Sequence, residues 1–152
     1  MMKHMKNDQR VIVLNRIIFI LSLIGVLMAT YVLQSWIRHA SIVCLTGGGC
    51  TLVAKSRYSY PFGIPVPAVG LAGYTMLTIL TFLRTMNEGL RTKLLPWVIG
   101  MGLFGVCFVS WFTYTELFLI KGVCTWCAVS AVNMVIIFLL AVISSHMQKR
   151  IA

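Results

Sequence analysis

The sequence is poor in charged residues, and poorest in acidic ones. Of its 152 residues 11% are charged and only 3 are Asp or Glu, whereas 59% are hydrophobic. The mean hydropathy is +0.92. Soluble globular domains carry about 25% charged residues, so this composition excludes that class and predicts a membrane protein.

Repeats, low-complexity segments and domain boundaries are also lacking, so we expect one domain over residues 1–152. No small-residue cleavage site follows the first apolar run before Trp36 and Arg38. The run is also longer than the hydrophobic region of a signal peptide, so we expect it to be retained as a membrane helix.

Four uncharged stretches have about the 20 residues that a helix needs to cross a membrane. The predicted fold is an all-α membrane protein, a four-transmembrane-helix bundle with a cysteine-bearing extracytoplasmic loop between helices 1 and 2. The helices are expected at about 17–37, 66–83, 94–115 and 122–145, and the outer loop at about 38–62. In the second helix, Gly70 and Gly73 are expected to permit close helix contact, as small residues do in membrane bundles.

Basic residues are distributed unevenly between the two sides of the predicted spans. Nine lie on one side: Lys3, Lys6, Arg10, Arg16, Arg84, Arg91, Lys93, Lys149 and Arg150. Four lie on the other: Arg38, Lys55, Arg57 and Lys121. The positive-inside rule then predicts a multi-pass protein with both termini in the cytoplasm. The net charge of +10 is explained by topology and lipid head groups, and we expect no nucleic-acid partner.

Four of the five cysteines fall near the predicted outer face, which we expect to be oxidising. Cys44 and Cys50 lie in the outer loop, and Cys124 and Cys127 follow a second outer loop at about 116–121. Cys107 lies in the middle of the third span and is expected to be a packing residue.

Cys124 and Cys127 have a spacing that lets two side chains meet across one helical turn. This spacing suits a disulfide, and a helix N-terminus favours the thiolate form of a cysteine. We therefore interpret the pair as redox-active. The alternative is an inert pair of small buried side chains.

Cys44 and Cys50 enclose three consecutive glycines, residues 47–49. Two cysteines in an extracytoplasmic loop most often form a structural disulfide. Glycine, however, makes this segment costly to order, which favours a mobile pair over a static brace. Together the two pairs predict thiol–disulfide exchange between a loop pair and a membrane-edge pair.

A thiolate metal binder or transporter is a further alternative. Zinc sites commonly use paired CxxC knuckles, and only one CxxC is present. The histidines lie elsewhere in the sequence, and a transport path would have Cys107 as its sole interior ligand. We therefore expect no metal site.

Several residues form, in their order along the chain, a pattern that resembles that of the bacterial vitamin K epoxide reductase family. They are Cys44, Cys50, Ser56, the FGIP at 62–65, Gly73 with Tyr74, and the CTWC at 124–127. The resemblance covers nearly the whole chain. It implies a four-helix bundle around a quinone pocket, in which the loop caps the CxxC. It also implies a bacterial inner-membrane enzyme that reoxidises an extracytoplasmic thioredoxin-like protein and reduces ubiquinone, menaquinone or a related quinone.

The resemblance assigns a role to each cysteine of the two pairs. Cys127 would lie beside the quinone, and Cys124 would exchange with the loop pair. Cys44 and Cys50 would meet the partner, and Ser56 would lie near the quinone or the active cysteines. Many bacterial relatives carry a fused thioredoxin-like domain; because this sequence ends at 152, we expect a stand-alone membrane domain with a separate partner.

One position departs from the animal members that reduce vitamin K. Those proteins have a tyrosine shortly after the CxxC, whereas Ala131 lies four residues beyond Cys127 here. The difference favours quinone-linked thiol oxidation. A vitamin K or quinone epoxide reductase remains the alternative enzyme.

Overall fold

The computed structural model describes residues 2–40, 42–45 and 47–149, with the side chains of 2–7 excepted. The elements along the chain are α1 (Met2–Ile37), α2 (Gly49–Lys55), η1 (Arg57–Ser59), η2 (Pro61–Gly63), α3 (Val66–Met86), α4 (Glu88–Lys93), α5 (Leu95–Tyr114), η3 (Thr115–Ile120) and α6 (Thr125–Lys149). Arg150, which the charge pattern places beside the fourth span, lies outside the described residues.

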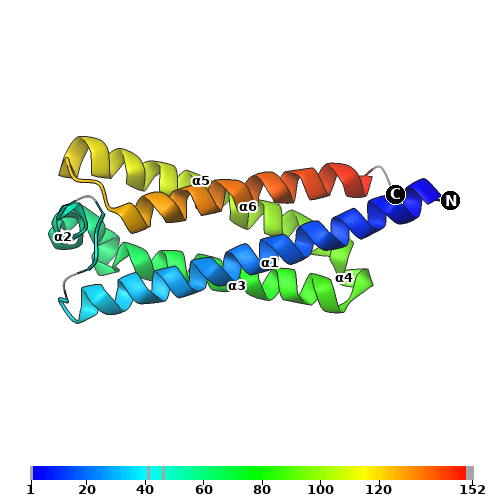
Figure 1. Ribbon diagram of the computed structural model, residues 1–152, viewed down its shortest axis with the longest axis horizontal. Coiled ribbons are helices and arrows are strands. Elements are labelled where there is room, and N and C mark those ends of the chain that lie inside the picture. Colours follow the sequence, from blue (N-terminus) through cyan, green and yellow to red (C-terminus); the bar gives the residue numbers. More distant parts are fainter. Residues whose placement is uncertain (1, 41, 46, 150–152) are drawn as a thin grey trace.

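Four long helices, α1, α3, α5 and α6, run side by side as an elongated bundle (Figure 1). Four segments of the described chain are long and apolar enough to span a membrane: Asp8–Ile37, Val66–Met86, Leu95–Ile120 and Thr125–Lys149. Both chain ends and α4 lie at one end of the bundle, here called the terminal end, and α2 lies at the other, the loop end (Figure 1). The predicted all-α, four-helix membrane fold is confirmed.

The bundle is held together by an apolar core and also carries apolar side chains on its outside. Ile18, Leu77 and Ile137 are fully buried where α1, α3 and α6 meet. Leu27 and Val132, in contrast, are more than 60% exposed on long helices. An apolar exterior suits a helix bundle in lipid, because each helix satisfies its own backbone hydrogen bonds.

Two predicted helix boundaries are wrong because charged residues do not end a helix. α1 begins at Met2, where a start near 17 was expected, and α6 ends at Lys149, where an end near 145 was expected. Backbone hydrogen bonding continues past the apolar run, and basic side chains remain in helical segments that extend beyond the hydrocarbon. α6 also begins later than the expected 122, at Thr125, so Cys124 lies just before the helix and not inside it.

The predicted outer loop at 116–121 is also wrong. Residues Thr115–Ile120 form the π-helix η3, which continues α5. Glu116 was taken to mark the end of the apolar span, yet its side chain is only 2% exposed. The stretch therefore stays in the packed bundle, and the chain reverses after it at Lys121, which has the left-handed φ of 54°.

The first connection, 38–62, contains ordered helical turns, although an irregular loop was expected. Gly47 and Gly48 have φ values of 60° and 99°, a backbone conformation that glycine adopts without a steric penalty. The turn they form leads into α2, whose first residue is the third glycine. The glycine run thus has a defined geometric task, which is to place Cys50 on α2.

Arg84 does not face lipid head groups, as its place in the charge pattern suggested. It is fully buried at the terminal end and donates a 2.9 Å hydrogen bond from Nη1 to Oδ1 of Asn15. Its Nε donates to the backbone carbonyl of Arg91 at 3.0 Å. The guanidinium therefore ties α3 to α1 and to α4.

Candidate active site

The loop end gathers four cysteines from three segments of the chain. Cys50 and Cys124 are both fully buried in one apolar cluster with Val53 and Phe112, and Cys44 and Cys127 pack against the same cluster. Cys107, on α5, is an exposed free cysteine. The structure therefore brings together the two cysteine pairs that the sequence singled out and leaves the fifth cysteine apart.

The two pairs are in different redox states. Cys44 and Cys50 form a disulfide with a Cα–Cα distance of 6.0 Å, whereas Cys124 and Cys127 are free thiols. The loop pair is thus oxidised and the membrane-edge pair is reduced.

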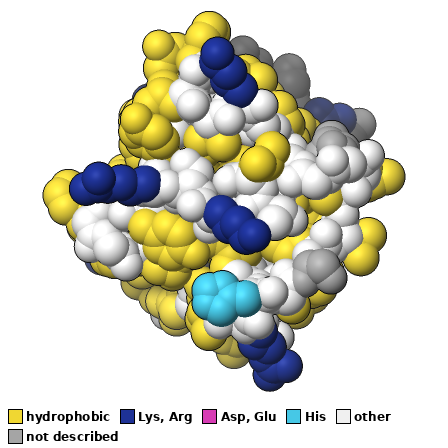
Figure 2. All heavy atoms as spheres, turned by 90° about the vertical axis from the view of Figure 1, so that its left-hand side faces the viewer, with side chains coloured by type: hydrophobic (Ala, Val, Ile, Leu, Met, Phe, Trp, Pro, Cys, Tyr) yellow, Lys and Arg dark blue, Asp and Glu magenta, His cyan; other side chains and the backbone are white. Residues whose placement is uncertain are grey.

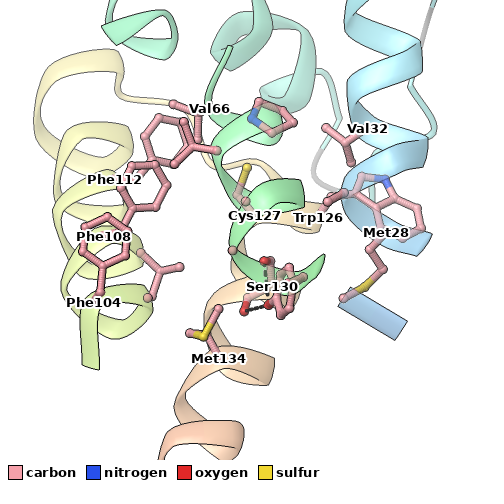
Figure 3. Close-up of a pocket in the computed structure, with 18 of the residues that line it drawn as sticks. Met28, Val32, Val66, Phe104, Phe108, Phe112, Trp126, Cys127, Ser130 and Met134 are labelled. Atoms are coloured by element: carbon pink, nitrogen blue, oxygen red, sulfur yellow. Dashed lines mark hydrogen bonds between the residues drawn. The ribbon is translucent and has the colours of Figure 1, made fainter. Parts of the chain in front are cut away.

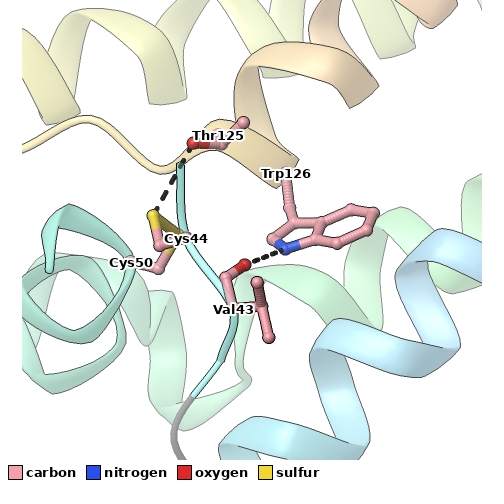
Figure 4. The surroundings of a disulfide bond; sticks show 5 residues. All are labelled: Val43, Cys44, Cys50, Thr125 and Trp126. Carbon is pink, nitrogen blue, oxygen red and sulfur yellow. Dashed lines mark hydrogen bonds between the residues drawn. A yellow bond between two sulfur atoms is a disulfide. The ribbon is translucent and has the colours of Figure 1, made fainter. Parts of the chain in front are cut away.

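The disulfide lies against the beginning of α6 (Figure 4). The Sγ of Cys44 is 3.6 Å from the Oγ1 of Thr125. The indole Nε1 of Trp126 donates a 3.0 Å hydrogen bond to the backbone carbonyl of Val43. These contacts attach the loop pair directly over the residues between Cys124 and Cys127.

A largely apolar pocket opens beneath this layer, between all four long helices, with an empty volume of about 870 Å³ that includes its open side. Phe104, Phe108 and Phe112 lie along one wall, and Trp126 lies on the opposite side (Figure 3). Cys127 lies between them and lines the pocket, whereas Cys124 does not. The apolar, aromatic lining suits a flat, lipid-soluble ring compound.

The aromatic wall could have been found from the sequence. Phe104, Phe108 and Phe112 are spaced four residues apart, which puts them on one face of a helix. The sequence alone does not show that this face looks into a cavity and not into lipid.

Gly70 and Gly73 also line the pocket, and the prediction that they permit close helix contact is wrong. A Cβ atom built on either residue would meet nothing within 4 Å. The missing side chains therefore leave open volume in the pocket wall. Close approach occurs elsewhere, at Gly25, where an added Cβ would overlap the ring of Tyr74.

A small polar group interrupts the apolar lining. The hydroxyl of Tyr74 donates to the backbone carbonyl of Ser130 at 3.0 Å and lies 3.1 Å from its Oγ. The Nδ2 of Asn133 lies 3.4 Å from the same hydroxyl. Tyr74 and Ser130 line the pocket, so they are the groups placed to orient a polar atom of a bound ring. Ala131 is not among the residues that line it.

The environment of Cys124 favours its thiolate. The hydrogen bond from the Cys127 side chain lowers the pKa of the Cys124 thiol below its usual value, against the opposing effect of burial. The carbonyl of Cys124 also accepts the first α6 hydrogen bond, from the N–H of Ala128 at 3.0 Å. Its position at the N-terminus of α6, where the helix dipole favours negative charge, acts in the same direction.

Glu116, for which the sequence predicts no role, also lies at this site. Its carboxylate and the thiols of Cys124 and Cys127 all lie within 4.8 Å of one another. One signal was available: Glu116 is the only acidic residue on the predicted outer side, eight residues before the CxxC. Its burial became evident only with the π-helix.

Ser56 is not brought to the pocket. Its Oγ accepts a 3.3 Å hydrogen bond from the N–H of Tyr58 and caps η1. It is not among the residues that line the cavity, so its placement gives no support to a role in quinone binding.

Within the described residues, Glu116, Cys124 and Cys127 are also the one group close enough to share a metal ion. Three donors fall short of the four that structural zinc takes. The two thiols are also the reduced one of the two cysteine pairs. We therefore interpret the group through its two thiols and not as a structural zinc site.

Comparison with known protein families agrees with this geometry. The model of the vitamin K epoxide reductase family matches residues 16–142, a range that begins within α1, ends within α6 and includes α3 and α5. The chain therefore belongs to this family, whose members are membrane oxidoreductases that work with quinones and thiol–disulfide pairs.

Proposed function

We propose that this family member generates disulfide bonds, by reoxidising an extracytoplasmic thioredoxin-like protein and passing its electrons to a membrane quinone. One observation carries the proposal. The reduced thiol of Cys127 lines an apolar pocket between the helices, while the oxidised Cys44–Cys50 pair lies at the loop end above it. The relay therefore links a lipid-soluble acceptor to a water-soluble donor.

The pocket residues fit a quinone. A quinone, when bound, supplies an acceptor for two electrons and two protons. The phenylalanines of α5 and Trp126 would hold its ring, and Tyr74 with Ser130 would orient a carbonyl oxygen. Cys127 is the one cysteine in this lining, so it would be the residue that faces the acceptor.

The cysteines themselves carry out two exchange reactions. In the first, the partner's two thiols become a disulfide while the Cys44–Cys50 disulfide is reduced. In the second, the loop thiols reduce a Cys124–Cys127 disulfide and become a disulfide again. The arrangement in the structure, with the loop pair oxidised and the CxxC reduced, corresponds to the state after this second exchange.

The face around the loop pair suits a protein partner. Val43 and Leu45, which flank Cys44, are 76% and 89% exposed. The loop-end face carries Lys and Arg side chains and one histidine among hydrophobic side chains, and no acidic side chain is in view (Figure 2). Apolar side chains next to the disulfide, on a face that carries positive charge and shows no acidic side chain, would suit a partner with an acidic rim.

The proposed setting is the bacterial inner membrane with the loop end outside. Both termini and α4 lie at the opposite end of the bundle, where most basic residues of the sequence are found (Figure 1). The positive-inside rule would place that end in the cytoplasm.

The test is a coupled assay with the purified, reduced protein. A reduced thioredoxin-like protein and a ubiquinone or menaquinone analogue are supplied, and quinone reduction is followed by absorbance together with partner thiols by alkylation. We expect one quinone reduced for each partner disulfide formed. Quinone reduction without partner oxidation would refute the proposal and favour an enzyme whose product is the reduced quinone.

We also expect Gly73→Leu to raise the KM for quinone, because the new side chain fills part of the pocket. Overpacking costs about 1–3 kcal/mol, which corresponds to roughly 5- to 150-fold in affinity. The helix itself should not suffer, since leucine has a higher helix propensity than glycine.

Gly100→Leu is the matched control for this substitution. Gly100 also has nothing within 4 Å of an added Cβ, but it does not line the pocket beside Cys127. An equal rise in KM for both variants would show that the cavity is not the quinone site.

A further inference from the structure

Glu116 is a buried acid with no compensating charge. The other two acidic residues, Asp8 and Glu88, both form salt bridges with Arg91 at the terminal end. Among the described residues no basic side chain forms a salt bridge with Glu116, and its Oε1 has no hydrogen-bond partner. A buried carboxylate oxygen without a partner is costly, so its position calls for an explanation.

The chain holds Glu116 in place through its backbone. The N–H groups of Lys121 and Gly122 both donate to its carbonyl oxygen, the second at 3.2 Å. These bonds close the π-helix and turn the chain toward Cys124. A π-helical turn inside a longer helix is frequently found at a functional site.

The chemistry of the neighbouring thiols requires a proton acceptor. Joining Cys124 and Cys127 in a disulfide breaks two S–H bonds and releases two electrons and two protons. Cys124 already tends toward the thiolate, so the proton that needs an acceptor in the buried site is that of Cys127. The surrounding cluster is apolar, and among the described residues the carboxylate of Glu116 is the one Asp, Glu or His side chain grouped with both thiols.

We propose that Glu116 is the proton acceptor of the Cys124–Cys127 pair, an inference that rests on the proposed function. As the S–S bond forms, the Cys127 proton moves to the Glu116 carboxylate and the electron pair leaves to the quinone. Glu116 does not line the pocket, so it then releases this proton, which balances one of the two protons that the reduced acceptor takes up. The second proton that the reduced acceptor takes up comes from water. It balances the proton that Cys124 released to water when it became a thiolate.

The groups around Glu116 leave few competitors for this role. The facing titratable groups are the two thiols at the start of α6, and Cys50 on α2 is held in the disulfide. Lys55 and Lys121 have exposed side chains. Tyr74 is engaged with Ser130 and Asn133.

The test compares Glu116→Gln and Glu116→Asp with Glu88→Gln as the control at an exposed acid, all in a Cys107→Ala background. Turnover is measured with quinone and a small dithiol across a range of pH. General acid–base catalysis contributes about 10²–10⁴-fold, so we expect E116Q to lower kcat by about 10²-fold or more at an unchanged KM for quinone. Its residual rate should rise with pH, since hydroxide must take the proton, and E116D should recover part of the activity.

A second readout needs no quinone. The ionised Glu116 carboxylate raises the pKa of Cys124, so E116Q should shift the thiolate absorbance titration to lower pH. A purely electrostatic Glu116 would then give E116Q more thiolate and equal or faster turnover. Slower turnover despite easier thiolate formation identifies the proton acceptor.

The outcomes separate the two proposals. If the wild-type protein reduces no quinone, the proposed function fails, while the titration still shows whether the carboxylate contacts the thiols. If the wild-type protein is active and E116Q matches it in kcat and pH profile, the role of Glu116 is refuted. A rise in KM in place of a fall in kcat would also refute it. Gln is neutral and nearly the same size, and thermal unfolding in detergent confirms that the variant is folded.

Discussion

Replacing Cys127 by alanine is expected to abolish quinone reduction, with the rate falling to that of the reaction without enzyme. Cys127 is the one cysteine that lines the apolar pocket. Without it no disulfide can form with Cys124, so the two electrons have no route to the acceptor. The measurement is the loss of quinone absorbance with a small dithiol as donor, which bypasses the loop pair.

The same variant should also change the acidity of Cys124. The hydrogen bond from Cys127 is the largest cause of the lowered pKa of Cys124, so its removal should raise that pKa and reduce the thiolate fraction at neutral pH. In a Cys107→Ala background the absorbance titration then reports Cys124 alone. Cys127→Ser, which keeps a hydrogen-bond donor, should shift the titration less while remaining inactive.

Cys107→Ala is the control for both measurements. Cys107 is exposed on α5 and lies outside the cysteine cluster. The Cys107→Ala protein should reduce quinone at the wild-type rate. Measurable quinone reduction by the Cys127→Ala protein would show that electrons leave through another residue, and the assignment of the pocket would then be wrong.

The helices were predictable because a membrane imposes a length and a composition. Uncharged runs of about 20 residues are strong signals, since lipid tolerates few charges and no open backbone. The same rule misled at Glu116, where a charge was read as the end of a span. A buried acid violates the composition rule, and only the three-dimensional arrangement shows what it faces.

The cysteine pairs were predictable from spacing, whereas their surroundings were not. Four cysteines on one membrane face indicate a relay. Spacing does not reveal that Cys124 is buried while Cys127 lines a cavity, because the two differ by less than one helical turn. The difference depends on where α5 and α3 leave space, and at Gly70 and Gly73 that space comes from absent side chains.

The connection between α1 and α3 is more ordered than its glycines suggested. Cys50 is fully buried on α2, whereas Cys44 is partly exposed and lies between the exposed Val43 and Leu45. A partner therefore reaches the disulfide from the Cys44 side. The glycines then act as the turn that lets a buried and an accessible cysteine bond to each other.

Loss of either loop cysteine is expected to stop oxidation of the partner protein while sparing a small dithiol. In Cys44→Ala or Cys50→Ala the partner's thiol has no loop disulfide to attack. The Cys124–Cys127 pair lies too deep in the protein for a folded partner to reach it. An intramolecular relay gains about 10⁵–10⁸ M in effective concentration, so we expect partner turnover to fall by at least about 10³-fold. A small dithiol can enter the site and reduce Cys124–Cys127 directly.

The two donors are compared on the same preparations by quinone absorbance, and the ratio of the two rates is the diagnostic quantity. The double variant Cys44→Ala/Cys50→Ala controls for a stray free thiol, and it should behave as the single variants do. Equal losses with both donors would mean that the loop disulfide braces the fold over α6 and takes no part in electron transfer. A retained rate with the partner protein would mean that the partner reaches Cys124 without the loop pair, because no other oxidised pair is available to it.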